Sequence, residues 1–410
     1  MQRFKYAFLL WGCIITLALL TAQSSSVEAA APKQGPHKTP PAPAASTTVV
    51  STLLGTTALS SSSVWAVGTT MNIPQFTGQP LIEHWDGNKW LIVPGPTTPS
   101  NELSTLIGAT AITNTDAWAV GFSMNVTKLT GQVLIEHWDG NNWQVVPGPT
   151  NVKPGGLSAI TALGPNNIWA VGSTDSASSA SSEALILHWD GNNWQTIPAA
   201  STTGASNLLS ISAVSANNIW AVGETFTTKE SKALIEHWDG SNWQVMPAPA
   251  SSMDFNKLSA VAAISNNNIW IVGNSFSQPS QVSPFIDHWN GSTWDAVSTS
   301  DLPPSFLPTT ISARNADDIW IAGGQALAHW NVKGWQSFPV ASQKDFKLFN
   351  AITALAHDNA WVVGSSLETN TIVPLVEHWN GSSWQVIPNP APAFKKATPS
   401  NVITNPVKHK

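Results

Sequence analysis

One short phrase recurs along this chain and constrains its fold more than any other feature. Its fullest copy, LIEHWDGNNWQVVPGP, occupies residues 134–149, and related copies begin at residues 81, 185, 234, 285, 327 and 375. The tryptophan that follows each histidine recurs every 41 to 53 residues, a period typical of solenoids, propellers and other arrays. These seven tryptophans are Trp85, Trp138, Trp189, Trp238, Trp289, Trp330 and Trp379.

Each repeat divides into four short segments that suit β-strands. In the third repeat they are residues 157–163, 168–172, 184–189 and 194–198. Glycine and proline punctuate every repeat, and no segment keeps a helical period over ten residues. Seven repeats of four strands predict an all-β fold, a seven-bladed β-propeller with four antiparallel strands per blade.

Two further tryptophans accompany the first in every repeat, so the repeat accounts for 21 of the 22 tryptophans. The Asp-Gly or Asn-Gly between the last two predicts a tight turn, because such turns need left-handed backbone positions. We expect the tryptophans on either side of this turn to pack between neighbouring blades, with Trp85 and its six equivalents buried. Each buried indole removes ~150–250 Å² from water.

The repeat resembles those of secreted bacterial β-propellers that read WAVG…HWDG..W, of the kelch or galactose-oxidase-like kind, over roughly residues 50–390. The kelch pattern has a pair of glycines at the end of its second strand. In this chain a single glycine such as Gly172 ends most second strands, and only Gly323-Gly324 forms a pair. The turn DGNNW also resembles the Asp-box of sialidase-type propellers. No residues match the copper ligands of galactose oxidase, and Arg314 is the only arginine after residue 3, too few for a sialidase arginine cluster. We expect no metal and no cofactor.

The ends of the chain differ in composition from the repeats. Residues 1–29 combine a basic start, an apolar run and small residues, which predicts a secretory signal peptide or, if uncleaved, a membrane anchor. Residues 30–46 form a Pro/Ala-rich linker, residues 47–390 the propeller, and residues 391–410 a C-terminal tail. Within that tail, TPSNVITN resembles TPSNELST at 98–105, so the tail is expected to return toward the first blade and help close the ring.

Three repeated polar positions each have a structural explanation. Carboxylates on different blades are usually farther apart than the ~5–10 Å of a glycosidase pair. One histidine per blade cannot converge on one metal, so each is expected to bond a backbone carbonyl or a neighbouring strand. Polar pairs such as Asn166-Asn167 are expected to cap turns. The carboxylates are Glu83, Glu136, Glu236, Asp287 and Glu377, and the histidines are His84, His137, His188, His237, His288, His329 and His378.

Variation between repeats is confined to the connections from second to third strand and from fourth strand to the next repeat. In a four-stranded blade these connections share one face, which is how a scaffold usually carries a binding site. The connection in the sixth repeat shrinks to Gly323–Gln325, which predicts a notch in this face. Phenylalanines gather in these connections, namely Phe76, Phe122, Phe226, Phe255, Phe276, Phe306, Phe346 and Phe349. They either contact a ligand or pack under their own loops. The proposed ligand-binding residues are Phe76, Phe226, Phe255, Phe276 and Phe346.

These features favour a secreted or cell-surface, monomeric, non-enzymatic scaffold for a glycan or protein ligand. The net charge of −6 and 10% charged residues argue against nucleic-acid binding. The alternative is an extracellular polysaccharide hydrolase or lyase with its site at the channel mouth, and a purely structural envelope protein is a third reading. Loop carboxylates available to an enzyme are Glu102, Asp175, Asp254, Asp301, Asp345 and Glu368.

Overall fold

The computed structural model describes residues 49–174, 182–227, 230–249, 255–277, 281–303, 306–331, 333–339, 346–368, 371–390 and 392. The predicted signal peptide and linker, and nearly all of the tail, lie outside these residues. Within them, helices of the length and apolarity needed to cross a bilayer are absent.

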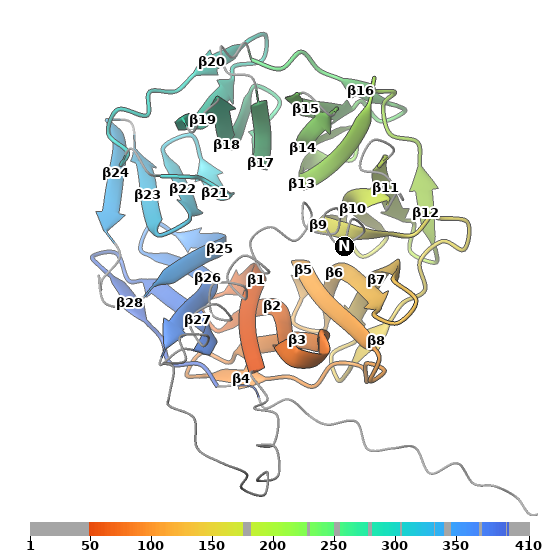
Figure 1. Ribbon diagram of the computed structural model, residues 1–410. Coiled ribbons are helices and arrows are strands. Elements are labelled where there is room, and N and C mark those ends of the chain that lie inside the picture. Colours follow the sequence, from red (N-terminus) through yellow and green to blue (C-terminus); the bar gives the residue numbers. More distant parts are fainter. Residues whose placement is uncertain are drawn as a thin grey trace, which may run out of the picture.

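The described residues form a ring of antiparallel sheets, with the chain running once around it (Figure 1). Twenty-eight strands form consecutive four-stranded units, each of which runs from an inner strand to an outer one. The all-β propeller with four antiparallel strands per blade is therefore confirmed. A 3₁₀ turn, Ile73–Gln75, follows the second strand.

The strands divide among the units as follows. The first unit holds β1 (Val49–Ser60), β2 (Ser63–Asn72), β3 (Thr77–Trp85) and β4 (Trp90–Ile92), and the second holds β5 (Glu102–Thr113), β6 (Asp116–Asn125), β7 (Thr130–Trp138) and β8 (Trp143–Val145). The third holds β9 (Gly155–Gly164), β10 (Asn167–Thr174), β11 (Ala184–Trp189) and β12 (Trp194–Ile197), and the fourth holds β13 (Ala205–Ser215), β14 (Asn218–Phe226), β15 (Ser231–Trp238) and β16 (Trp243–Val245).

The remaining strands continue the pattern. The fifth unit holds β17 (Phe255–Ser265), β18 (Asn268–Ser277), β19 (Gln281–Trp289) and β20 (Trp294–Ala296). The sixth holds β21 (Thr310–Asn315), β22 (Asp318–Gly323), β23 (Ala326–Asn331) and β24 (Gly334–Pro339), and the last holds β25 (Lys347–Ala356), β26 (Asn359–Glu368), β27 (Thr371–Trp379) and β28 (Trp384–Val386).

The prediction of seven blades is wrong as a count of sheets, because hydrogen bonding divides the described strands into five. Two of the five sheets have eight strands, since one parallel pairing in each joins two neighbouring units. Gly78 pairs with Leu103 in the first of these sheets, and Ser231 pairs with Phe255 in the second. The repeated sequence thus determines the four-stranded unit. Whether two adjacent units form one sheet depends on a main-chain pairing where the loops meet the strands.

The glycine that ends each second strand is required by a close approach of two main chains. At Gly68 a Cβ would overlap the carbonyl oxygen of Thr52 on β1, where β1 carries a bulge between Leu53 and Gly55. The equivalent glycines of the other units meet a carbonyl oxygen in the same way. The turn between third and fourth strands also behaves as predicted, since Gly140 has a φ of 94°.

Tryptophans from neighbouring units pack together around the ring, as predicted. Trp118 on β6 lies 5.1 Å from Trp189 and 5.7 Å from Trp194 of the next unit, measured between ring centroids. Trp361 makes the same contacts with Trp85 and Trp90, at 5.1 and 5.5 Å, so the last unit packs on the first. Tryptophan contacts of this kind add to the apolar area buried between units.

The predicted burial of Trp85 and its equivalents needs correction. Of that set only Trp379 is buried, and the other six are half-buried. Four of these six donate their indole N–H to a carbonyl oxygen in the turn between first and second strands, as Trp189 does to Pro165 O at 3.1 Å. The tryptophans of the second strands are the fully enclosed ones, with exposures of 0–4% for Trp65, Trp118, Trp169, Trp220, Trp270, Trp320 and Trp361.

Candidate functional site

Two opposite faces of the ring differ in character. The turn face carries the turns that join first to second and third to fourth strands. The loop face carries the connections that join second to third strands and one unit to the next. Because the strands of a unit alternate in direction, these two classes of connection lie on opposite sides.

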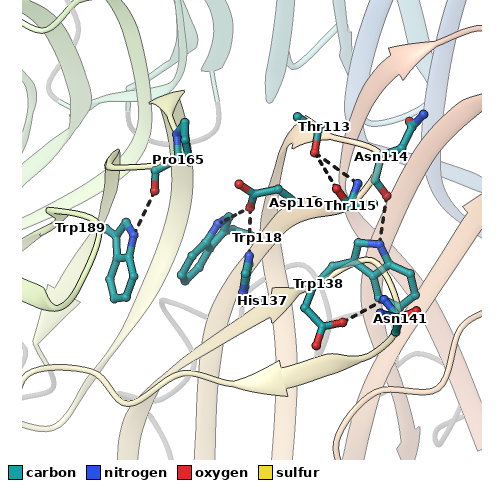
Figure 2. A network of polar contacts seen from close by, with 11 residues as sticks. Thr113, Asn114, Thr115, Asp116, Trp118, His137, Trp138, Asn141, Pro165 and Trp189 are labelled. Carbon is teal, nitrogen blue, oxygen red and sulfur yellow. Dashed lines mark hydrogen bonds and ion pairs between the residues drawn. The ribbon is translucent and has the colours of Figure 1, made fainter.

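The repeated histidines belong to a structural network near the turn face. His137 lies with its Nε2 2.9 Å from Asp116 Oδ1, which also accepts a hydrogen bond from Trp118 Nε1 at 3.0 Å (Figure 2). The imidazole stacks on the Trp118 indole with centroids 4.1 Å apart. Equivalent histidine contacts to the start of the second strand span 2.8–3.2 Å and join His84 to Ser63, His188 to Asn167, His237 to Asn218, His288 to Asn268, His329 to Asp318 and His378 to Asn359.

This network confirms that each histidine bonds a neighbouring strand, and it corrects the role given to the polar pairs. Asn167, expected to cap a turn through the backbone, instead accepts hydrogen bonds from two side chains, His188 and Trp169. Burial lowers the pKa of His188 and His378 below the usual value, so these imidazoles favour the neutral form. Side chains held this way serve the fold rather than an exposed reaction.

The repeated carboxylates are buried on the third strands of their units. Burial raises the pKa of Glu83 and Glu236 to about 7, of Glu136 to about 8 and of Asp287 to about 6. Their partners differ from unit to unit. Glu236 accepts the main-chain N–H of Ala200 at 3.1 Å, and one oxygen of Glu136 has no hydrogen-bond partner in the described residues. All five carboxylates are shielded from solvent, so a polysaccharide could not reach them.

The fifth repeated carboxylate, Glu377, forms a buried ion pair. Lys347 Nζ donates to Glu377 Oε1 at 2.8 Å, and both side chains are almost fully enclosed. Lys347 begins β25, so the pair lies within the last unit. It supplies the charge compensation that buried ions require.

The phenylalanines proposed as ligand-binding residues fall into different environments. Phe76, Phe276 and Phe346 are exposed, and Phe226 is half-buried. Phe255 begins β17, but its side chain lies outside the described structure. Among the other loop phenylalanines, Phe306 and Phe349 are buried, and both pack into the cores between units. The sequence left open whether the loop phenylalanines contact a ligand or pack within the protein, and these two pack within the protein.

Three exposed apolar residues lie on the loop face in consecutive units around the ring, and they are called the apolar patch below. These are Phe346 of the last unit, Phe76 of the first and Leu129 of the second, and Phe76 and Leu129 are each 56% exposed. Phe76 and Leu129 are the only non-glycine residues in the described chain with positive φ, at 51° and 54°. A bulky side chain rarely adopts this strained conformation, and strain of this kind gathers at functional sites.

One buried apolar cluster draws residues from the same three units as the patch. Val50, Met71, Leu103 and Ile372 form its centre, with Ile73, Val126 and Leu367 among the residues packed against it. Main-chain hydrogen bonds link Phe76 and Phe346 to residues packed against this cluster. Phe76 N–H donates to Ile73 O at 3.3 Å, and Leu367 N–H donates to Phe346 O at 2.8 Å. Leu129 follows Val126 in the same loop, and its N–H donates to Asn125 O at 2.8 Å.

Leu129 was missed by the sequence argument, which considered only aromatic residues. The signal that could have found it is a leucine in the otherwise polar stretch TKLTG at 127–131. The loop carboxylates offered for the enzyme alternative do not converge in the described residues. Glu102 is engaged by Ser123 at 2.6 Å, Asp301 and Glu368 are exposed, and Asp175, Asp254 and Asp345 lie outside the described residues.

The turn face carries its own depression, of about 500 Å³, between the fifth and sixth units. Asn268, His288, Asp295, Asp317 and Trp330 are among the residues that line it. The predicted notch of the sixth unit concerns the opposite face and stays a prediction, because residues 340–345 beside it lie outside the described structure. One group on the turn face, Asp318, His329 and His357, is composed of donors suited to a metal ion.

Comparisons with known proteins show the fold. No family model matches the sequence, and no curated protein matches it either. Among solved structures, YCF48 bound to D1 peptide is 17% identical with a TM-score of 0.53, covering 82% of this chain and 94% of that one. An ulvan lyase of polysaccharide lyase family PL25, bound to a GlcA–Rha3S saccharide, is 9% identical with a TM-score of 0.53, covering 82% and 95%.

A third likeness is to a chain of the mitotic checkpoint complex, 12% identical with a TM-score of 0.50, covering 87% of this chain and all of that one. These neighbours include a peptide-bound protein, a saccharide-bound enzyme and a component of a protein assembly. At such low identity the likeness extends to the architecture alone. The chain is a β-propeller, and its function must be argued from its own residues.

Proposed function

We propose that this protein is a non-enzymatic binding scaffold, exported from the cytoplasm, that holds its ligand on the loop face. The observation that carries the proposal is the apolar patch of Phe76, Leu129 and Phe346. Exposed bulky side chains in a strained backbone cost free energy in the unbound protein. Removing them from water on binding would return part of that cost.

The composition of the patch favours a protein or peptide ligand over a glycan. Sugars stack on flat aromatic rings, whereas Leu129 presents an aliphatic side chain that suits apolar side chains of a polypeptide. The neighbours of similar architecture that are bound to a peptide or belong to a protein complex support a ligand of this kind. Burial of the repeated carboxylates, together with the contacts that hold the repeated histidines against neighbouring strands, supports binding without turnover.

The experiment is a selection of peptides from a displayed library, run beside a glycan array, on the full-length protein. The double variant Phe76→Ser and Leu129→Ser should lose at least tenfold in affinity for the selected ligand. Val145→Ser is the matched control, because Val145 is as exposed but lies on the outer strand β8. A ligand that binds the double variant as well as the native protein would overturn the proposal. Binding to the glycan array with no peptide selected would show that the ligand is a glycan and not a polypeptide.

Export is a separate part of the proposal and has its own test. The basic and apolar features of residues 1–29 support it. N-terminal sequencing of the protein isolated outside producing cells should give a first residue between 23 and 30. Recovery of the protein only from the cytoplasm, with Met1 retained, would contradict export.

A further inference from the structure

Asp318, His329 and His357 form a cluster at the boundary between the sixth and last units. One ligand atom from each side chain lies within 4.8 Å of the other two. Asp318 and His329 are buried, while His357 is exposed on the turn between β25 and β26. We propose that these three residues bind a divalent metal ion of the zinc class, an assignment independent of the loop-face ligand.

The distances suit this chemistry. Zinc is bound by His nitrogen and carboxylate oxygen at ~2.0–2.2 Å in tetrahedral geometry, which puts two ligand atoms roughly 3.3 Å apart. His329 Nε2 already lies 2.8 Å from Asp318 Oδ1, so both atoms can face one ion after a small separation. The exposed His357 side chain needs to approach by at most about 1.5 Å, which rotation of its side chain can provide without disturbing a core.

The repeat itself supplies the comparison that singles out this boundary. The cluster position of His357, four residues before the second-strand tryptophan, faces the preceding unit. Asn266 holds that position in the fifth unit, and its Oδ1 accepts a hydrogen bond from Asn218 Nδ2 of the fourth at 2.7 Å. A side chain here therefore reaches the preceding unit's polar network. The equivalents are Ser61, Asn114, Pro165, Ala216, Asn266, Ala316 and His357.

Only one boundary combines an Asp–His pair with a histidine at this position. The second unit has such a pair, Asp116 and His137, but the following unit presents Pro165 there (Figure 2). The remaining units have Asn or Ser in place of the aspartate. Two departures from the repeat therefore occur at the same boundary, the aspartate at 318 and the histidine at 357. If each residue had only a structural role, these two departures would not need to occur together.

The carboxylate of Asp318 is also oriented differently from its equivalents in the second to fifth units. In the second to fifth units that side chain accepts the indole N–H of the second-strand tryptophan, as at Trp169. Trp320 Nε1, by contrast, has no partner among the described residues. Asp318 Oδ2 instead accepts from Arg314 at 2.6 Å, which leaves Oδ1 directed toward His329 and the proposed ion.

The donor set determines the kind of ion. Two imidazoles and one carboxylate suit Zn²⁺, Co²⁺, Ni²⁺ or Cu²⁺, whereas Ca²⁺ and Mg²⁺ prefer oxygen ligands alone. Three protein ligands leave a position for water on the exposed side. Because the ligands come from two units, a bound ion would join the sixth unit to the last and raise the melting temperature.

The test uses full-length protein without a histidine tag, stripped of metal and titrated with Co²⁺ and Zn²⁺. We expect one equivalent of Co²⁺ with the visible absorption of a tetrahedral site, displacement by Zn²⁺, and a rise in Tm with Zn²⁺. His357→Ala and Asp318→Asn should each weaken Zn²⁺ binding at least tenfold and abolish the Tm rise. Both replacements occur at equivalent positions in other units, as Ala216 and Asn167, so the fold accepts them.

Asp116→Asn is the matched control, because it makes the same change in the unit that lacks the third ligand. It should bind Zn²⁺ as the native protein does. Equal Zn²⁺ affinity in the native protein and in His357→Ala would overturn the proposal, as would native protein that shows no Tm rise with Zn²⁺. Titration with Mg²⁺ should leave Tm unchanged, and a larger effect of Mg²⁺ than of Zn²⁺ would contradict the assigned class of ion.

Discussion

Asn389 Nδ2 donates hydrogen bonds to both carboxylate oxygens of Glu83, at 3.0 and 3.3 Å. Asn389 follows the last strand, β28, and Glu83 lies on β3 of the first unit, so this contact spans the point where the ring closes. Between the last unit and the first, Asn350 Nδ2 also donates to Leu53 O at 2.7 Å. Ring closure in the described residues thus uses side-chain contacts and tryptophan packing between complete units. The proposed return of residues 398–405 lies outside the described structure.

Replacing Asn389 by Ala should destabilise the protein by about 1–3 kcal/mol, because it leaves a buried carboxylate without its donor. The loss should be larger at pH 8.5 than at pH 5, since the pKa of Glu83 is about 7 and the donor matters most to the charged form. Chemical denaturation at both pH values measures it. Gln385→Ala, an exposed change on β28, is the control, and equal losses for both variants would contradict this account of ring closure.

Glu136 should make the native protein less stable as pH rises. Burial raises its pKa from the ordinary value of 4.5 to about 8 in the folded state, so folding favours the protonated form. Its stabilising effect is therefore full below pH 4.5 and is lost as pH rises through 8. Glu136→Gln should remove this loss. It should raise the free energy of unfolding at pH 9 by a few kcal/mol, because a pKa that differs this much between the folded and unfolded states corresponds to a free energy of that order.

Denaturant titrations of Glu136→Gln and native protein at pH 5 and pH 9 check this expectation. Glu183→Gln serves as the control, because Glu183 is exposed and its ion pair with Lys153 should contribute less than about 1 kcal/mol. A stability difference between Glu136→Gln and native protein that does not grow from pH 5 to pH 9 would show that Glu136 is ionised in the folded state.

Much of the architecture could be predicted because the same pattern of strands and turns occurs in seven copies of the repeat. The strand order, the Asp-Gly turns and the packing of Trp118 on the next unit all follow from residues that recur at fixed spacing. The count of sheets could not, because it depends on single main-chain pairings such as Gly78 with Leu103. Such a pairing arises from how one loop end lies beside another, and no side-chain pattern encodes it.

The candidate sites were harder to predict because they depend on departures from the repeat. Leu129 differs from its surroundings in its exposure and in its backbone conformation, a φ of 54° that its residue type disfavours. His357 is separated from His329 by 28 residues and meets it only because adjacent units pack. The assignment of polar pairs to turn caps failed for a related reason, since Asn167 finds its partners across strands rather than along the chain.

The buried pair of Lys347 and Glu377 should show strong coupling. Lys347→Met leaves Glu377 buried without a counter-charge and should cost about 3–5 kcal/mol. Adding Glu377→Leu should recover most of this loss, because Leu187 occupies the equivalent position in the third unit and shows that the fold accepts it. Free energies of unfolding for both single variants and the double variant give the coupling, and strictly additive effects would contradict the pair.

Leu129→Gly should stabilise the protein while weakening the proposed ligand binding. A left-handed conformation costs a non-glycine residue ~1–2 kcal/mol, and glycine relieves that strain while it adds entropy to the unfolded chain. The net gain should be up to about 1 kcal/mol in the free energy of unfolding. Leu129→Ala removes the same exposed side chain but keeps the strain, so it should weaken binding without raising stability. If Leu129→Gly is no more stable than Leu129→Ala, then the backbone at Leu129 is not strained, and the apolar patch must be explained by its exposure alone.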